Sequence, residues 1–259
     1  MPFFKNLGSF GTLKNIIARL RSPRGCPWDR RQTHASLKAG LLEECYEVLQ
    51  ALDQENSEKL CEELGDLLMQ IVLHAQIASE AGKFNVADVL RGINTKLIHR
   101  HPHVFGELKL RNAQEVVLNW ESLKREERRE GESLLAGVPR EMPALAYSQA
   151  VQRRVATAGF DWEEVDGVID KPVEEVAEFK QADDEEEKAR EFGDLLFTLA
   201  NIARKLGIDL EAALRSANQC FYRRFVYMEG VCRQQGINFD NLSFAQQNAL
   251  WEEAKQRVK

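Results

Sequence analysis

The sequence predicts an all-α protein built from two similar helical units. Apolar residues recur at intervals of three and four in several segments, as on one face of an amphipathic helix; Phe192, Leu195, Leu199 and Ile202 form one such stripe. Strand signals are weak, because alternating Val, Ile and Thr segments joined by tight Asn-Gly turns are missing. The 259 residues include 16 glycines and 7 prolines, a low usage that favours long uninterrupted helices.

The second observation behind this fold class is an internal duplication. Four features recur in the same order at shifts of 124 to 131 residues, which chance does not explain. We therefore expect two repeats, an N-terminal unit over residues 1–133 and a C-terminal unit over residues 134–259. The recurring pairs are Glu-Glu-x-x-Glu at 43–47 and 174–178, Glu-x-Gly-Asp at 63–66 and 191–194, Asn94 and Arg100 with Asn218 and Arg224, and Trp120 and Lys124 with Trp251 and Lys255.

Several helix ends are recognisable from local signals. Gly82 and Gly207 each follow a long periodic segment, which predicts that a helix ends just before them. Asp184 and Glu187 have the spacing of a capping box at a helix start. Pro102, between His101 and His103, predicts a loop at this position.

Composition and charge disfavour several classes of protein. The 35 basic and 41 acidic residues give a net charge of −6, whereas nucleic-acid binding requires a basic face. No apolar run approaches the roughly 18 residues needed to cross a bilayer, so no association with a membrane is expected. Five cysteines, none in a C-x-x-C pair, favour the reducing cytoplasm over a disulfide-linked extracellular protein.

Each unit carries four carboxylates with the spacing of two facing helices. Residues three or four apart project from one side of a helix. The turns near 54–57 and 183–184 are short, so the paired helices should run antiparallel and bring their carboxylates together. The converging residues are Glu44, Glu47, Glu63 and Asp66 in the first unit, and Glu175, Glu178, Glu191 and Asp194 in the second.

Such a cluster predicts a metal site. Two like charges about 4 Å apart repel by roughly 4 kcal/mol at an effective dielectric of about 20, and a bound cation or raised pKa values relieve this repulsion. Hard oxygen donors select Mg²⁺, Mn²⁺ or Ca²⁺ over zinc or copper. Di-iron bundles use Glu-x-x-His, whereas both units here have Asp in the fourth position, which argues against iron.

A solvated acidic helix face is the alternative interpretation of these residues. It would suffice for a single Glu-Glu-x-x-Glu, which is common on exposed helices. The complete pattern occurs twice, with a glycine before each Asp, and this favours the metal site. Because a mid-helix glycine costs about 1 kcal/mol relative to alanine, Gly65 and Gly193 predict that another helix approaches closely there.

Cationic and aromatic residues follow each acidic set. Mg²⁺ held by carboxylates, with Lys and Arg nearby, is the usual arrangement around a phosphate chain. No Gly-x-x-x-x-Gly-Lys-Ser/Thr occurs, which excludes a P-loop enzyme. Trp120 and Trp251 have two open interpretations, stacking on a base or packing in a core.

The chain resembles the MazG family of nucleoside triphosphate pyrophosphohydrolases in its two-repeat form. Glu-Glu-x-x-Glu followed by Glu-x-x-Asp occurs twice, and residues 25–29 and 100–105 are similar to further family signatures. The resemblance implies helical repeats that form four-helix-bundle units through homodimerisation. It also implies Mg²⁺-dependent hydrolysis of NTPs and dNTPs to a nucleoside monophosphate and pyrophosphate, with Mn²⁺ as a substitute ion. The implied role is removal of unwanted nucleotides.

The resemblance also implies roles for individual residues. In the C-terminal unit, Glu175, Glu178, Glu191 and Asp194 would bind Mg²⁺, and Glu174 would orient or deprotonate the attacking water. The implied nucleotide contacts are Lys171, Arg190, Asn201, Arg224, Trp251 and Lys255, with Lys96 and Arg100 in the first unit. Cys220 departs from the family pattern, because Lys is common at that position.

The C-terminal unit is the favoured active unit. Thr198 and Asn201 continue the polar face of Glu191 and Asp194, whereas Leu73 stands in the first unit where Asn201 stands in the second. Three other functions remain open. They are a phosphohydrolase that cleaves a different bond, a non-catalytic regulatory protein that binds Mg-nucleotide, and a purely structural helical protein.

Overall fold

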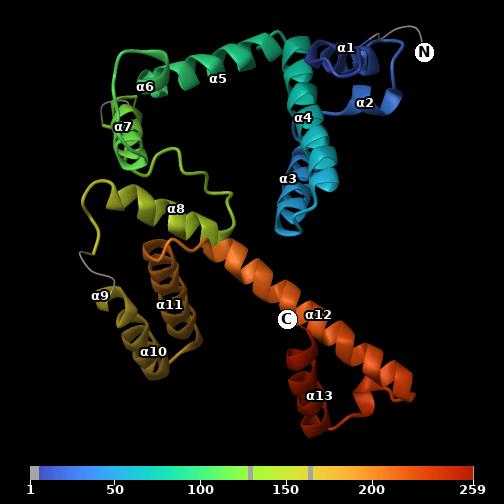
Figure 1. The fold of residues 1–259 in the computed structure, drawn as a ribbon, viewed down its shortest axis with the longest axis vertical. Coiled ribbons are helices and arrows are strands. Elements are labelled where there is room, and N and C mark those ends of the chain that lie inside the picture. The colour runs from blue at the N-terminus through green and yellow to red at the C-terminus, as the bar shows by residue number, and fades with distance from the viewer. Residues whose placement is uncertain (1–5, 128–130, 163–165, 259) are drawn as a thin grey trace. The chain divides into compact units, whose positions relative to one another are not determined.

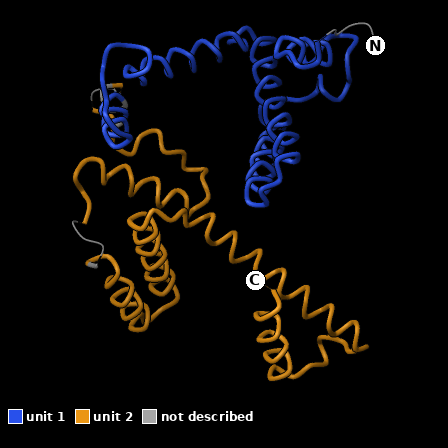
Figure 2. The backbone as a smooth tube through the Cα atoms, viewed as in Figure 1, with its two compact units in different colours: residues 1–123 blue, residues 124–259 orange. Residues whose placement is uncertain are grey.

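The chain is helical in every part that positions the carboxylates (Figure 1). The computed structural model describes residues 6–127, 131–162 and 166–258, and within these ranges no strand occurs, as the sequence predicts. The chain divides into two compact units, Met1–Leu123 and Lys124–Lys259 (Figure 2). The sequence-based repeat boundary at residue 134 stays a prediction. None of the described helices is long and apolar enough to pass through a bilayer.

The N-terminal unit is organised around a helical hairpin. Helices α3 and α4 pack side by side, and α1 packs against α4 over a core of Ile17, Leu37, Val72 and Leu73. Val72 and Leu73 of α4 are the core residues that the hairpin itself contributes. The helices of this unit are α1 Phe10–Arg21, α2 Pro27–Arg31, α3 Lys38–Asp53, α4 Ser57–Glu80, α5 Val86–Arg100 and α6 Pro102–Phe105, and α7 Ala113–Glu126 crosses the boundary between the units.

The C-terminal unit contains a second hairpin of the same kind. Helices α10 and α11 form it, α8 packs against α11, and α13 packs against α12. Gln149, only 2% exposed, fixes the turn into α12: its Nε2 donates to the Ile208 carbonyl at 2.8 Å, and its Oε1 accepts from the Leu210 amide at 3.1 Å. The elements are α8 Ala144–Ala156, α9 Asp166–Ile169, α10 Lys171–Gln181, α11 Glu185–Lys205, α12 Leu210–Gln235, a 3-10 turn η1 Phe239–Asn241 and α13 Phe244–Arg257.

The helix ends follow the local signals, with two differences. Gly82 and Gly207 adopt left-handed φ values of 65° and 70° just after α4 and α11, which confirms the predicted ends. Asp184 caps α11 by accepting from the Glu187 amide at 2.7 Å, but the Glu187 carboxylate accepts from the amide of residue 183 instead of closing the capping box. The loop predicted at Pro102 is wrong, because this proline begins the short helix α6, where its fixed φ is favourable.

Each hairpin leaves large apolar side chains uncovered. Leu42 and Leu64 of the first hairpin are 52% and 49% exposed, and Val173 and Phe192 of the second are 73% and 50% exposed. A Cβ added at Gly65 or Gly193 would meet no atom of the described chain within 4 Å, so no helix of the same copy approaches closely there. The predicted close approach stays a prediction for a pair of copies.

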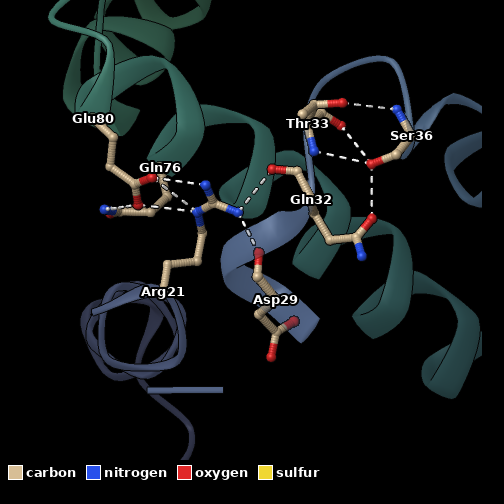
Figure 3. Close-up of polar contacts among 7 residues, drawn as sticks. All are labelled: Arg21, Asp29, Gln32, Thr33, Ser36, Gln76 and Glu80. Carbon is tan, nitrogen blue, oxygen red and sulfur yellow. Dashed lines mark hydrogen bonds and ion pairs between the residues drawn. The ribbon is translucent and has the colours of Figure 1, made fainter. Parts of the chain in front are cut away.

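Arg21 holds the start of the first hairpin in place (Figure 3). Its side chain is 6% exposed and binds the Glu80 carboxylate through Nε at 3.0 Å and Nη2 at 2.7 Å. Its Nη1 donates to the backbone carbonyls of Asp29 and Gln32. Ser36 in turn donates to the Gln32 side chain at 2.7 Å, two residues before α3 begins. One guanidinium therefore ties α1, α2 and α4 to the segment that leads into α3.

Replacing Arg21 with methionine should lower the free energy of unfolding by about 3 kcal/mol. The substitution preserves an apolar stem but removes the donors of two backbone carbonyls and the partner of Glu80. Urea denaturation of the full chain measures this difference. An unfolding curve that matches the unsubstituted chain would show that this network does not stabilise the fold.

Glu80→Gln should show a pH-dependent effect of the same ion pair. The hydrogen bond from Arg21 lowers the pKa of Glu80 below its ordinary value of 4.5. The stabilisation is therefore present above pH 4.5 and is lost as the pH falls through the lower pKa of the folded state. The difference in unfolding free energy between the two proteins should shrink in that acidic range, and a constant difference would contradict this assignment.

Candidate metal centre

Each hairpin brings three carboxylates close together. Within each group the nearest ligand oxygens lie within 4.8 Å of one another, which suits a single cation. Two of the acids in each group come from one helix and the third comes from its partner, as the spacing and the short turns require. The first group is Glu44 of α3 with Glu63 and Asp66 of α4; the second is Glu175 and Glu178 of α10 with Glu191 of α11.

In the N-terminal unit, Glu47 lies beside this cluster of acids, and their negative charges disfavour its ionised form. Repulsion from Glu63, followed by burial and by repulsion from Glu44, raises the pKa of Glu47 above 4.5. Glu63 is 2% exposed and forms an ion pair with Lys59, one turn earlier on α4. The single lysine therefore compensates the excess negative charge only in part, and a divalent cation would relieve the remainder.

In the C-terminal unit, Glu191 is the buried member, 8% exposed, and Arg190 compensates its charge. Arg190 Nη2 lies 2.6 Å from a Glu191 oxygen, and this hydrogen bond, with the negative charge of Glu191, raises the pKa of the guanidinium. Asp194 lies outside the 4.8 Å group, near enough for its charge to act on Arg190. Thr198 Oγ1 is 3.4 Å from Glu175, so the polar face of α11 continues beyond the acids.

Lys171 lies at the start of α10 and faces the acids. Its Nζ binds Glu174 at 2.6 Å, and this hydrogen bond, then the charges of Glu174, Glu175 and Glu178, raise the pKa of the amine. The predicted water-orienting residue and one predicted phosphate contact are therefore ion-paired to each other. Both are partly exposed, and either can exchange its partner for a ligand.

Three predicted nucleotide contacts form a separate cluster on α12 and α13. The Arg224 guanidinium lies over the Trp251 ring at 5.8 Å, and Lys255 pairs with Glu252 at 2.7 Å. Trp251 also packs against Phe221 at 5.2 Å between ring centres. Among the residues that the structure describes, no contact joins this cluster to the carboxylates of α10 and α11. In the N-terminal unit, Lys96 is exposed on α5 and Arg100 ends that helix.

Asn201, another predicted contact, lies in the wall of a cavity of about 700 Å³. Sequence reasoning missed the other polar residues of this wall, Gln152, Asp161 and Arg204. In the sequence, the only sign of this site was the series of polar residues on one face of α11 that ends at Asn201. Asp161, whose segment lines the other side, lies 43 residues before Arg204 in the chain, and short-range patterns do not reveal how such a segment docks.

Comparison with known proteins identifies the family. Residues 32–105 match the MazG nucleotide pyrophosphohydrolase domain, and residues 147–220 match the phosphoribosyl-ATP pyrophosphohydrolase domain. The chain is 44% identical over 247 residues to the nucleoside triphosphate pyrophosphohydrolase/pyrophosphatase MazG of Thermotoga maritima, with 95% of both chains covered. This chain belongs to the MazG family.

Two further relatives support this membership. The nucleoside triphosphate pyrophosphohydrolase of Escherichia coli K12 is 42% identical, over 95% of this chain and 96% of that protein. The uncharacterized protein YabN of Bacillus subtilis is 44% identical, over 95% of this chain and 52% of that protein. Each of the two matched regions contains one complete cluster of three acidic residues. A metal-dependent MazG centre therefore fits both hairpins.

Glu47→Gln should raise the melting temperature of the metal-free protein at pH 7. The raised pKa shows that ionised Glu47 is disfavoured in the folded state, so this cost appears as the pH rises through that pKa and is absent below 4.5. Thermal unfolding with and without Mg²⁺ measures the effect. The ion should stabilise the wild type more than the variant, because the variant lacks one charge that the ion would neutralise.

Glu186→Gln is the control for this comparison, because Glu186 is an exposed acid on α11 outside both groups. Its melting temperature should respond to Mg²⁺ as the wild type does. An Mg²⁺ response that is equal in the wild type and in Glu47→Gln would show that Glu47 does not contribute to a metal site.

Proposed function

We propose that this chain hydrolyses nucleoside and deoxynucleoside triphosphates between the α and β phosphates, releasing a nucleoside monophosphate and pyrophosphate. The observation that carries the proposal is the cluster of three carboxylates on the α10–α11 hairpin. It occurs in a chain that is 44% identical over 95% of its length to a MazG pyrophosphohydrolase. The biological role would be the removal of unwanted nucleotides. We expect it to act in the cytoplasm on free nucleotides, since a net charge of −6 does not suit nucleic acid.

The chemistry of the donor set fits Mg²⁺. Glu175, Glu178 and Glu191 supply hard carboxylate oxygens within 4.8 Å of one another, and Asp194 is the fourth predicted ligand. When bound, Mg²⁺ neutralises the triphosphate and lowers the pKa of a water molecule, and Mn²⁺ could replace it. Glu44, Glu47, Glu63 and Asp66 form the equivalent predicted set in the N-terminal unit.

Residues of the chain itself would orient the water and the phosphates. Lys171 and Arg190 would bind phosphate oxygens, as charge-assisted donors. A phosphate that draws Lys171 away from Glu174 would leave the Glu174 carboxylate able to accept a proton from the attacking water. Substrate binding would thus prepare the base. Arg224, Trp251 and Lys255 stay predicted nucleotide contacts.

The C-terminal unit is the proposed catalytic unit. The polar face of α11 leads from Glu191 to Asn201, which lies in the wall of a cavity. In the N-terminal unit, the equivalent residue Leu73 is 5% exposed and part of the hydrophobic core. In the first hairpin the polar face therefore continues from the carboxylates only as far as the buried Gln70, the equivalent of Thr198, and ends at Leu73.

A homodimer would cover the open faces of the hairpins. Isolated two-helix hairpins do not bury their apolar residues, and four helices do. The exposed apolar residues of α3, α4, α10 and α11 therefore support pairing with a second copy of this chain. They include Leu42, Tyr46, Leu64, Leu68, Ile71, Val173, Phe192, Leu196 and Leu199.

Glu178→Gln should lower Mg²⁺-dependent pyrophosphate release by about 10²–10³-fold, because it removes one metal-binding charge and metal catalysis supplies several kcal/mol. Glu178 is exposed, so the fold should tolerate the change. A coupled pyrophosphate assay over a panel of NTPs and dNTPs gives the rates, and phosphorus NMR identifies the products. The exposed-acid control Glu186→Gln should retain wild-type turnover.

The outcomes separate the parts of this proposal. Unchanged turnover in Glu178→Gln would contradict the site, and orthophosphate as the product would contradict the cleaved bond. The same assay on Glu47→Gln measures any contribution of the N-terminal unit. Tight NTP binding with no turnover would indicate the regulatory alternative, which the names of the relatives do not favour.

A further inference from the structure

Lys59 lies on the face of α4 that carries the acids of the first hairpin. Glu63 and Asp66 follow it by four and seven residues, which is about one and two turns of the helix. Side chains with these spacings project in nearly the same direction. The Lys59 amine binds the Glu63 carboxylate directly and lies 3.4 Å from Glu62. Lys59 therefore holds the most buried carboxylate of the predicted metal site, since Glu63 is only 2% exposed.

The charge of Lys59 also acts across the hairpin. Repulsion from Glu63 is the largest effect that raises the pKa of Glu47 on α3, and the charge of Lys59 offsets part of it. Among the ion pairs of the described residues, Lys59 is the only basic partner of the four predicted ligands in this hairpin. One amine thus acts on acids of both helices, as a bound cation would.

The two cations beside the acids of the second hairpin have no counterpart in the first. Arg190 corresponds to Glu62, an acid, at the shift of 128 residues between the hairpins. Lys171 corresponds to Gly40, which has no side chain, at a shift of 131 residues. Lys171 and Arg190 are the proposed phosphate donors of the second hairpin. The first hairpin lacks both, and Lys59 is the basic residue that it places at its acids instead.

The Lys59 amine can leave Glu63 without leaving the site. Its side chain is 46% exposed, so the amine can move toward water. A divalent cation competes with the amine, because both are attracted to the charge of Glu63. Since Lys59 is anchored one turn from Glu63 on the same helix face, the released amine stays beside the ion. An ammonium in this position is a strong donor to phosphate oxygens on the ion.

We propose that Lys59 is an exchangeable counter-ion of the first hairpin. It holds Glu63 while no ion is bound, gives up that carboxylate to a divalent cation, and then binds the phosphate chain of the nucleotide. This inference rests on the proposed function, because it takes the metal-binding acids from it. It adds a phosphate-binding residue to the N-terminal unit and couples that contact to the ion.

Lys59→Met should change the binding of ion and phosphate in opposite directions. Glu178→Gln is the background for this test, because it weakens the second site and leaves the first to be measured. Mn²⁺ should bind about tenfold more tightly in Lys59→Met, since no amine has to be displaced and one positive charge near the ion is removed. In saturating Mn²⁺, inorganic tripolyphosphate should bind about tenfold more weakly, since a charge-assisted hydrogen bond is lost.

Electron paramagnetic resonance of the free ion measures Mn²⁺ binding, and calorimetry measures tripolyphosphate binding, both on the full chain. Lys59→Arg retains the positive charge and should keep both dissociation constants near those of the background protein. Lys83→Met is the matched control, because Lys83 is an exposed lysine of the same unit outside the acidic cluster. It should change neither constant. If Lys59→Met does not fold in a thermal melt, Lys59→Gln, which keeps a hydrogen-bond donor for Glu63, decides the outcome.

Opposite shifts separate an exchangeable counter-ion from a residue that only stabilises the hairpin. Loss of a merely structural contact would weaken the binding of both ligands. That result, unchanged constants, absence of Mn²⁺ binding in the background protein, or equal shifts in Lys83→Met would overturn the inference. Failure of the wild type to cleave any NTP, with the opposite shifts still present, would instead overturn the proposed function alone.

Discussion

Repulsion between carboxylates that two helices hold together is the constraint on which this structure depends. Glu63 and Glu191 are nearly buried, and each lies within a group of three acids. Such an arrangement is unfavourable in isolation, as the raised pKa of Glu47 shows. Packing and hydrogen-bond networks outside the groups therefore stabilise the hairpins, and a bound cation would relieve the remaining repulsion. Lys59 and Arg190 each compensate part of the charge within the chain.

The two hairpins share this electrostatic arrangement and differ in what lies beyond it. In the first, Leu73 joins Ile17 and Val72 in the core under α1, so packing occupies the helix face beyond the acids. In the second, Asn201 and Arg204 occupy the corresponding part of α11 beside a cavity. The same local motif thus leads to a closed core in one unit and to a cavity with polar wall residues in the other.

Membership of the MazG family and the exposed hairpin faces fit one physical picture. A hairpin by itself leaves the repulsion between its acids uncompensated and its apolar side chains exposed to water. A bound ion would neutralise the acids and in turn hold a phosphate chain, and a second copy of the chain would cover the apolar side chains. Stability, assembly and substrate binding would therefore be coupled through the same few helices, because both sets of side chains lie on the same α10–α11 framework.

The sequence by itself determined the helical class, the duplication and the convergence of the acids, because these depend on periodicity and on turns of a few residues. It also indicated helix ends such as Gly82, but misplaced the effect of Pro102, which begins a helix. Only the tertiary structure revealed the cavity, since the pairing of Asp161 with Arg204 joins residues 43 positions apart. Docking over such a distance depends on the combined shape of α8 and α11, which no local pattern encodes.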